Sequence, residues 1–231
     1  MKPPSIHLSC GLLEFCHPAG SLLGGTKKRR TLACTRTIVK FGTHLYKSDA
    51  PLRSIYSIMT GTLKTFAVAK TGEERVIGFH MRGAILGLDA MEAGHYTASA
   101  IALEDSQVCI VPTEYLGQHC QQGKSVAQRI HVAMAREMNI RQRMVFMLGG
   151  KTAEQRVASF LIDLAATYFA LGYSSSDINL VMSRAEIGSY LGLTFETVSR
   201  IMSSFQNRRL LAVNRKHIRI LDIEGLKRTK G

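Results

Sequence analysis

The strongest constraint on the fold lies in residues 183–211, where two short helices must follow each other with almost no chain between them. Ser183 and Glu186 stand three residues apart, which is the spacing of a capping box and predicts a helix start. Gly192 suits the tight turn after this helix, and Thr194 suits the N-cap of a second one. A helix, a short turn containing glycine and another helix together predict a helix-turn-helix.

The second of these helices, predicted to run to about Arg208, separates apolar from polar side chains. Glu196, Ser199 and Arg200 stand at i, i+3 and i+4, so they share one exposed face near its N-terminus. Arginine can bond guanine O6 and N7 together, glutamate can accept from the cytosine amino group, and serine can bond a base or contact a thymine methyl group. We predict that these three residues contact base edges; the alternative is a surface ion pair between Glu196 and Arg200. The predicted apolar side consists of Val198, Ile201, Met202 and Phe205.

A small hairpin is predicted next, because the apolar runs 211–213 and 218–221 flank a turn at 214–216. It would form a wing beside the recognition helix. Residues 196–231 hold 9 basic against 3 acidic residues, a balance suited to a polyanion. Contacts to phosphates position a protein on DNA without specifying a sequence. The candidates for such contacts are Arg184, Arg208, Arg209, Arg215 and Lys216.

Residues 125–148 contain neither proline nor glycine and predict a helix about 36 Å long at ~1.5 Å per residue. Apolar residues recur along it at steps of three and four, and Arg141 is the single break. A stripe this narrow favours a pairing seam in a parallel dimer, with an ordinary packing helix as the alternative. Gly149 and Gly150 are expected to end the helix and offer a hinge. The predicted dimerisation residues are Ile130, Met134, Met138, Arg141 and Val145.

The region from about Leu32 to Val111 differs, because short strand-like runs alternate there with glycine turns. Several close strands without a long helical segment predict an all-β barrel or sandwich. A further short strand is expected at 180–182, before the helix-turn-helix.

Composition narrows the function class. The chain has 231 residues, 45% of them hydrophobic, and a net charge of +13, which is typical of a globular protein with a basic surface. No apolar run reaches the roughly 18 residues that span a bilayer, and no secretory signal is apparent, so a soluble cytoplasmic protein without a membrane partner is expected. Paired carboxylates, a nucleophile elbow and a phosphate-loop motif are absent from the sequence, so no enzyme is expected.

These residues resemble the CRP/FNR family of transcription regulators. Residues 187–200 are very similar to the FNR branch, the fumarate and nitrate reduction regulators, whose E-x-x-S-R pattern falls on Glu196, Ser199 and Arg200. Residues 71–80 and 83–94 resemble the sensor domain of that branch. The resemblance implies a homodimer that binds double-stranded DNA at inverted repeats of TTGAT-type half-sites, with RNA polymerase as a partner.

The fold that the resemblance implies is of the α+β class. It consists of a β-roll sensor domain that is cupin-like and of the cyclic-nucleotide-binding type, a long dimerisation helix and a C-terminal winged helix-turn-helix. The expected divisions are a cysteine-containing N-terminal arm at 1–30, the β-roll at 31–124, the dimerisation helix at 125–149 and the DNA-binding domain at 150–231.

Cyclic AMP is not expected as the ligand. Members of the family that bind cyclic nucleotides carry a Gly-Glu pair and an Arg-Ser pair around the phosphate. The matching stretches here are Arg82-Gly83-Ala84 and residues 95–98, and both pairs are absent. No charged group is therefore placed to hold a cyclic phosphate.

The resemblance implies instead an oxygen-labile [4Fe-4S] cluster held by four cysteines, three from an N-terminal C-x2-C-x5-C run and one from the β-roll. Cys10 and Cys16 fit the C-x5-C spacing, and Cys109 matches the β-roll ligand. The first position of the run is His7, which departs from the family pattern.

Three alternatives follow from the missing cysteine. His7 could be the fourth ligand, since histidine replaces cysteine at some iron–sulfur centres. Cys34 or Cys120 could take that place. In the third alternative the cluster is lost, and the same scaffold senses thiol oxidation, haem or a small ligand. With five cysteines and no export signal, the thiols are expected to be core residues or metal ligands.

Overall fold

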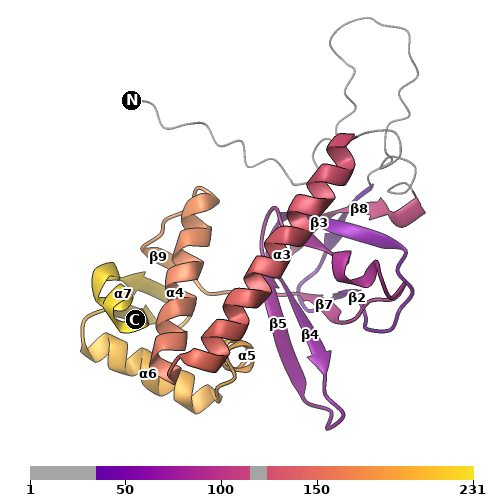
Figure 1. Ribbon diagram of the computed structural model, residues 1–231. Helices are drawn as coiled ribbons and strands as arrows, with labels where there is room; N and C mark the ends of the chain where they lie inside the picture. The colour runs from indigo at the N-terminus through magenta and orange to yellow at the C-terminus, as the bar shows by residue number, and fades with distance from the viewer. Residues whose placement is uncertain (1–34, 115–123) are drawn as a thin grey trace, which may run out of the picture. The chain divides into compact units, whose positions relative to one another are not determined.

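The computed structural model describes residues 35–114 and 124–231 (Figure 1). The candidate ligands His7, Cys10 and Cys16 lie outside the described residues, as do Cys34 and Cys120. The chain divides into two compact units. One comprises residues up to 67 together with 79–137, and the other comprises 68–78 together with 138–231.

Residues 35–112 form two four-stranded sheets, which confirms the predicted β-rich sensor domain. One sheet has the order β1-β8-β3-β6 and the other the order β2-β7-β4-β5. The strands are β1 (Thr35–Val39), β2 (His44–Tyr46), β3 (Ser54–Thr60), β4 (Leu63–Val68), β5 (Glu74–His80), β6 (Ile85–Leu86), β7 (Ser99–Ala102) and β8 (Ser106–Pro112), with the short helix η1 (Leu88–Ala90) after β6.

The sheet β1-β8-β3-β6 is buried on both faces around the middle of β8. Ile58 of β3 pairs with Val108 of β8, and both side chains belong to the core inside the roll. Their neighbours Ser57 and Cys109 also pair, and each is 0% exposed. Because successive side chains of a strand point to opposite faces, Ser57 and Cys109 lie on the face of the sheet away from that core.

A long helix α3 (Lys124–Gly150) follows the roll, and α4 (Ala153–Ala170) comes after it. The helix expected at 125–148 is confirmed, but Gly149 and Gly150 form its last residues instead of ending it. The break falls at Thr152, which is extended and caps α4: its hydroxyl accepts from Gln155 N, and the Gln155 side chain accepts from Thr152 N. Within the described residues, no helix is long and apolar enough to cross a membrane.

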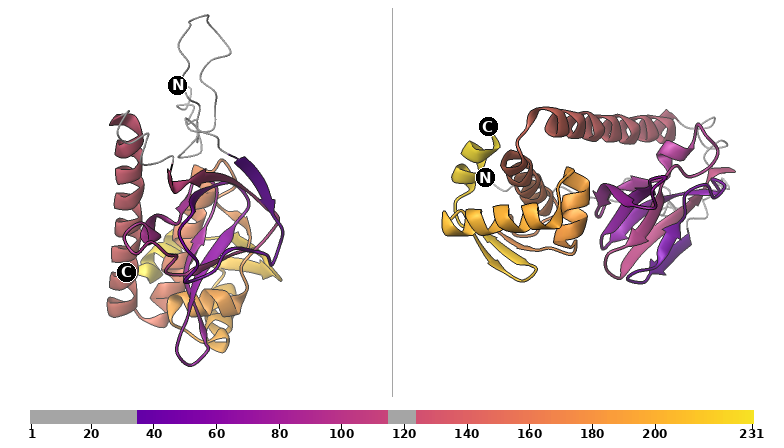
Figure 2. Two further views of the ribbon diagram at one scale, coloured as in Figure 1. Left: turned by 90° about the vertical axis from the view of Figure 1, so that its right-hand side faces the viewer. Right: turned by 90° about the horizontal axis from the view of Figure 1, so that it is seen from below.

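The remaining elements form a small domain around the predicted helix-turn-helix. They are β9 (Asp177–Asn179), α5 (Arg184–Leu191), α6 (Phe195–Asn207), β10 (Leu211–Asn214), β11 (His217–Ile220) and α7 (Ile223–Lys230). The strands form a sheet in the order β10-β11-β9. The right-hand view of Figure 2 shows the β10–β11 hairpin, in yellow, beside α6. The residues expected on the apolar side of α6 are all buried: Val198, Ile201, Met202 and Phe205.

The strand expected at 180–182 was placed wrongly, since β9 covers 177–179. The register is set by Ile178, which pairs with Ile218 of β11. Leu180 adds one backbone bond, from its N–H to the Lys216 carbonyl at 2.7 Å, before the chain leaves the sheet for α5. The apolar run reflects burial, because Leu180 and Met182 are 4% and 2% exposed without belonging to a strand.

Candidate DNA interface and sensor site

The helix-turn-helix is shaped by a cap at each end of α5 and by the close approach of Gly188 to the turn that follows. The Ser183 hydroxyl accepts from Glu186 N at 3.2 Å, and the Glu186 carboxylate accepts from Ser183 N at 2.7 Å. Gly192 adopts the left-handed conformation, with φ 65°, which ends α5. A Cβ at Gly188 would come within 2.7 Å of the Leu193 carbonyl oxygen, so a larger residue there would push the turn away. This requirement was not predicted, although Gly188, four residues before Gly192, was the signal for it in the sequence.

The predicted recognition residues Glu196, Ser199 and Arg200 differ in their exposure to solvent. Glu196 and Arg200 are exposed on the first turns of α6. Hydrogen bonds from its own backbone N–H and, second, from the Thr194 hydroxyl hold the pKa of Glu196 below its usual value. The carboxylate therefore stays an acceptor at neutral pH. The Ser199 hydroxyl oxygen is buried and has no hydrogen-bond partner in the part of the chain that is described.

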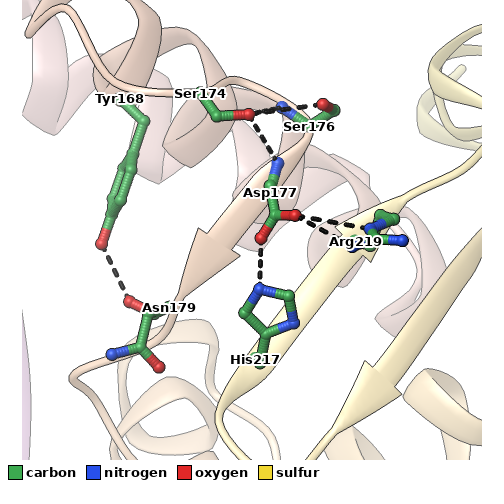
Figure 3. Close-up of polar contacts among 7 residues, drawn as sticks. All are labelled: Tyr168, Ser174, Ser176, Asp177, Asn179, His217 and Arg219. Atoms are coloured by element: carbon green, nitrogen blue, oxygen red, sulfur yellow. Dashed lines mark hydrogen bonds and ion pairs between the residues drawn. The ribbon is translucent and has the colours of Figure 1, made fainter.

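The wing is fastened along β11 by the carboxylate of Asp177 on β9 (Figure 3). This carboxylate accepts hydrogen bonds from His217 Nε2 and, at 3.3 Å, from an Arg219 guanidinium nitrogen, both on β11. The Ser174 hydroxyl accepts from Asp177 N at 3.0 Å, and the Tyr168 hydroxyl donates to the Asn179 carbonyl at 2.9 Å. The contacts tie the hairpin to β9 and to the end of α4.

The candidate phosphate contacts lie in different surroundings. Arg215 and Lys216 form the exposed two-residue turn of the wing, where Arg215 has φ 56°. Arg209 is exposed after α6, and Arg184 is half-buried at the start of α5. Arg208 is exposed at the end of α6, where it forms an ion pair with Glu154 of α4 and donates to the Thr229 hydroxyl of α7 at 3.1 Å. In this structure its guanidinium serves the packing of three helices.

Tyrosine rings occupy the interior of the β-roll. Tyr46 stacks on Tyr96 with ring centroids 4.0 Å apart and on Tyr56 at 5.6 Å. The Tyr96 hydroxyl donates to the Ser54 carbonyl at 2.7 Å. Burial raises the pKa of Tyr46 and of Tyr56 above the ordinary value, so these hydroxyls stay neutral. The stretch 95–98 thus contributes a buried aromatic ring to the core where the nucleotide-binding pattern would need a charged clamp.

Cys109 is the one candidate cluster ligand among the described residues, and its side chain is 0% exposed on β8. It is disulfide-bonded, and the other four cysteines of the chain all lie outside the described ranges. Within those ranges, no group of three or more histidine, cysteine, aspartate or glutamate side chains could hold a metal ion. Only in its reduced form could Cys109 supply one thiolate to a cluster, and any further cysteine ligands would have to come from outside the described residues.

The predicted dimerisation stripe of α3 changes character along its length. Ile130 is 5% exposed, so it is already buried within the chain, and Met134 is half-buried. Met138 and Val145 are 63% and 71% exposed, and Arg141 between them is exposed as well. The second half of the helix thus carries an apolar stripe that nothing in the described chain covers.

A capped helix-turn-helix with a wing, in one chain with a β-roll and a long helix, defines a DNA-binding regulator that carries a sensor domain. The chain matches the Crp-like helix-turn-helix domain over residues 155–229 and the cyclic nucleotide-binding domain over residues 37–122.

Similar proteins agree with this class. The chain is 39% identical to the transcriptional regulatory protein btr of Bordetella pertussis, over 100% of this chain and 96% of that protein. It is 36% identical to the fumarate and nitrate reduction regulatory protein of Escherichia coli strain K12, over 84% of this chain and 77% of that protein. The solved structure of FixK2 from Bradyrhizobium japonicum superposes with a TM-score of 0.79 at 27% identity, covering 87% of this chain and 98% of that one.

The chain belongs to the Crp/FNR family of transcription regulators. It is a DNA-binding transcription regulator and not an enzyme, as the sequence predicted. Regulators of this family bind DNA through the helix-turn-helix and are typically dimeric.

Proposed function

We infer that this regulator is an oxygen-responsive homodimer that carries a [4Fe-4S] cluster and binds inverted repeats of TTGAT-type half-sites. The observation that carries the cluster is Cys109, a fully buried cysteine on the face of its sheet away from the roll core, at the position where the resemblance places the β-roll ligand. The 36% sequence identity to the fumarate and nitrate reduction regulatory protein of Escherichia coli supports the assignment.

The chain's own residues would hold the cluster through thiolates of Cys109, Cys10 and Cys16, with His7, Cys34 or Cys120 as the fourth ligand. When bound, the cluster would make the protein responsive to oxygen, because oxygen breaks the cluster down. The interior of the roll is filled by Tyr46, Tyr56 and Tyr96, which argues against cyclic AMP as the signal.

DNA recognition would fall to the exposed face of α6. Glu196, held as a carboxylate, would accept from a cytosine amino group, and Arg200 would bond the guanine of the half-site. The residues that would contact phosphates are Arg184, Arg208, Arg209, Arg215 and Lys216. A dimer with two-fold symmetry would place two recognition helices on the two halves of an inverted repeat, roughly 34–36 Å apart.

RNA polymerase is the proposed protein partner, and the exposed loop around residues 71–74, between β4 and β5, is the proposed contact. Residues 68–75 are exposed throughout and include charges of both signs, at Lys70, Glu73 and Arg75.

The cluster is tested on protein purified without oxygen. About four irons and four sulfides per chain are expected, with visible absorption that bleaches in air. Cys109→Ser is expected to lose most of the iron and sulfide, because it removes a thiolate ligand. Anaerobic wild-type protein that is colourless and free of iron and sulfide would contradict the cluster and leave the DNA-binding assignment untouched.

Thiol oxidation is the second candidate function, and the disulfide at Cys109 is the observation that favours it. In metal-free protein, a thiol oxidant would then change the affinity for DNA, and Cys109→Ser would abolish that change. An oxidant response that survives in Cys109→Ser would rule out this thiol as the sensor.

Arg141 is proposed to restrain pairing along α3, since it lies in the seam between Met138 and Val145 and would face its twin in a parallel dimer. Two like charges about 4 Å apart in water repel by about 1 kcal/mol. Arg141→Ala is therefore expected to tighten dimerisation of cluster-free protein by about fivefold, measured by analytical ultracentrifugation. Arg143→Ala, an exposed arginine off the stripe, is the matched control. No gain over wild type would count against this role.

A further inference from the structure

One arginine side chain joins the ends of two helices in the C-terminal unit. Arg156, on the first turn of α4, donates from Nη2 to the Leu148 carbonyl of α3 at 2.7 Å and from Nε to the Lys151 carbonyl at 3.0 Å. Its Nη1 donates to the carbonyl of Leu191, the last residue of α5, at 3.2 Å. All of these residues belong to one compact unit. We call these three hydrogen bonds the carbonyl clamp.

The ends of α3 and α5 both benefit from such a donor. The last four carbonyls of an α-helix have no partner within the helix, and the aligned peptide dipoles make that end negative. Neither α3 nor α5 has a basic residue in its last turn. Arg156 therefore brings a positive charge to both ends from a third helix. Because a guanidinium is planar and its N–H directions are fixed, it bonds these carbonyls in one relative arrangement of the helices.

The junction between α3 and α4 has little else to fix its angle toward the helix-turn-helix. It follows Gly149 and Gly150, where an added Cβ would meet no atom within 4 Å, so packing at the glycines does not hold it. Glycine is also the residue with the freest backbone. The Lys151 side chain donates to the Lys230 carbonyl at 2.8 Å, which ties the junction to α7. The carbonyl clamp of Arg156 adds α5, the first helix of the helix-turn-helix.

We propose that Arg156 is a positioning residue that determines which separation of two half-sites the dimer accepts. The inference rests on the proposed homodimer and its inverted TTGAT-type repeat. In such a dimer α3 pairs with its twin, so the angle between α3 and α5 decides where each recognition helix lies relative to the two-fold axis. Each base pair inserted between the half-sites moves them apart by about 3.4 Å and rotates one relative to the other by about 35°. A fixed angle therefore fits one separation.

The experiment varies the separation of the half-sites. The full chain, purified without oxygen, is titrated by fluorescence anisotropy at one fixed salt concentration. One series of duplexes carries two TTGAT half-sites whose separation changes by one base pair at a time, and another duplex carries one half-site beside a scrambled one. Wild type is expected to bind one separation about tenfold or more tightly than the adjacent ones, because only there do both recognition helices engage together.

Arg156→Ala is expected to lose this preference without losing the half-site itself. Its affinity for the single half-site is expected to stay within about twofold of wild type, because Arg156 contacts no base in this role. At the best separation it is expected to bind about fivefold or more weakly than wild type, with adjacent separations within about threefold of each other. A merely structural role would lower the affinity for every duplex by the same factor.

Two further variants separate geometry from charge and from surface effects. Arg156→Lys keeps the positive charge and the aliphatic stem but not the planar fork, so it is expected to lose the spacing preference as Arg156→Ala does. It also keeps the proposal testable if Arg156→Ala does not fold, which circular dichroism shows. Arg228→Ala is the matched control, because Arg228 of α7 is exposed in the same unit and pairs with Asp222 at 3.4 Å. It is expected to keep the affinity and the preference of wild type.

The outcomes separate this inference from the proposed function. A wild-type spacing preference that persists in Arg156→Ala or in Arg156→Lys overturns the role of the carbonyl clamp. An equal loss on the single and the paired half-sites overturns it as well. Wild type that prefers the half-site but binds all separations equally contradicts the inference alone. Wild type that binds a scrambled duplex as tightly as the TTGAT duplexes contradicts the proposed half-site and, with it, the inference.

Discussion

Arg200→Ala is expected to weaken binding to a TTGAT-type duplex by about 1–3 kcal/mol per half-site, roughly 5- to 150-fold. The guanidinium is exposed on the face of α6 that carries Glu196, and no ion pair within the described residues engages it. It is therefore available for the two acceptors of guanine. The measurement is fluorescence anisotropy at one fixed salt concentration, because affinity for DNA depends steeply on salt.

Base substitution distinguishes this loss from a general loss of charge. Replacing the guanine of the half-site with adenine is expected to weaken wild type strongly and Arg200→Ala little. Arg209→Ala, which removes a proposed phosphate contact, is expected to weaken binding to both duplexes by the same factor. If Arg200→Ala behaved like Arg209→Ala, the guanine contact would be wrong.

Phe205→Ala is expected to lower the free energy of unfolding of the C-terminal unit by about 3–5 kcal/mol, the range for removing a buried aromatic ring. The ring is 0% exposed among the buried residues of α6, and the Arg208 guanidinium lies 5.7 Å from its centroid. Its loss leaves a cavity and also removes the surface on which Arg208 rests.

Urea denaturation followed by circular dichroism measures the effect. Phe169→Ala, on the surface of the same unit, is expected to change stability by no more than about 0.5 kcal/mol. A loss below about 1 kcal/mol in Phe205→Ala would mean that the domain refills the space, and that the ring is not a central part of its core.

The helix-turn-helix was predictable because its signals are local. The cap at Ser183 joins atoms three residues apart, and the left-handed Gly192 needs only the backbone of its own turn. The apolar side of α6 follows from helix periodicity in the same way. Each of these features depends on residues within one or two turns, so a short stretch of sequence contains the whole interaction.

The site was less predictable where distant segments meet. Arg208 was predicted to contact a phosphate, and its pairing with Glu154, 54 residues earlier in the chain, was not predicted. Asp177 was not singled out by the sequence, yet it holds His217 of the wing across 40 residues. Charge and spacing cannot tell which of several arginines is already paired, because pairing depends on how α4, α6 and α7 pack.

The sequence by itself determined that this chain has a β-rich sensor domain, a long helix and a capped helix-turn-helix, and that Glu196 and Arg200 share one face. Caps, turns and periodicity are short-range, so they persist whatever the rest of the chain does. Only the tertiary structure decided that the Ser199 hydroxyl is buried, that Phe195 is exposed, and that Cys109 lies on the face of its sheet away from the roll core. Burial depends on which surfaces meet, and those surfaces come from parts of the chain far apart in sequence.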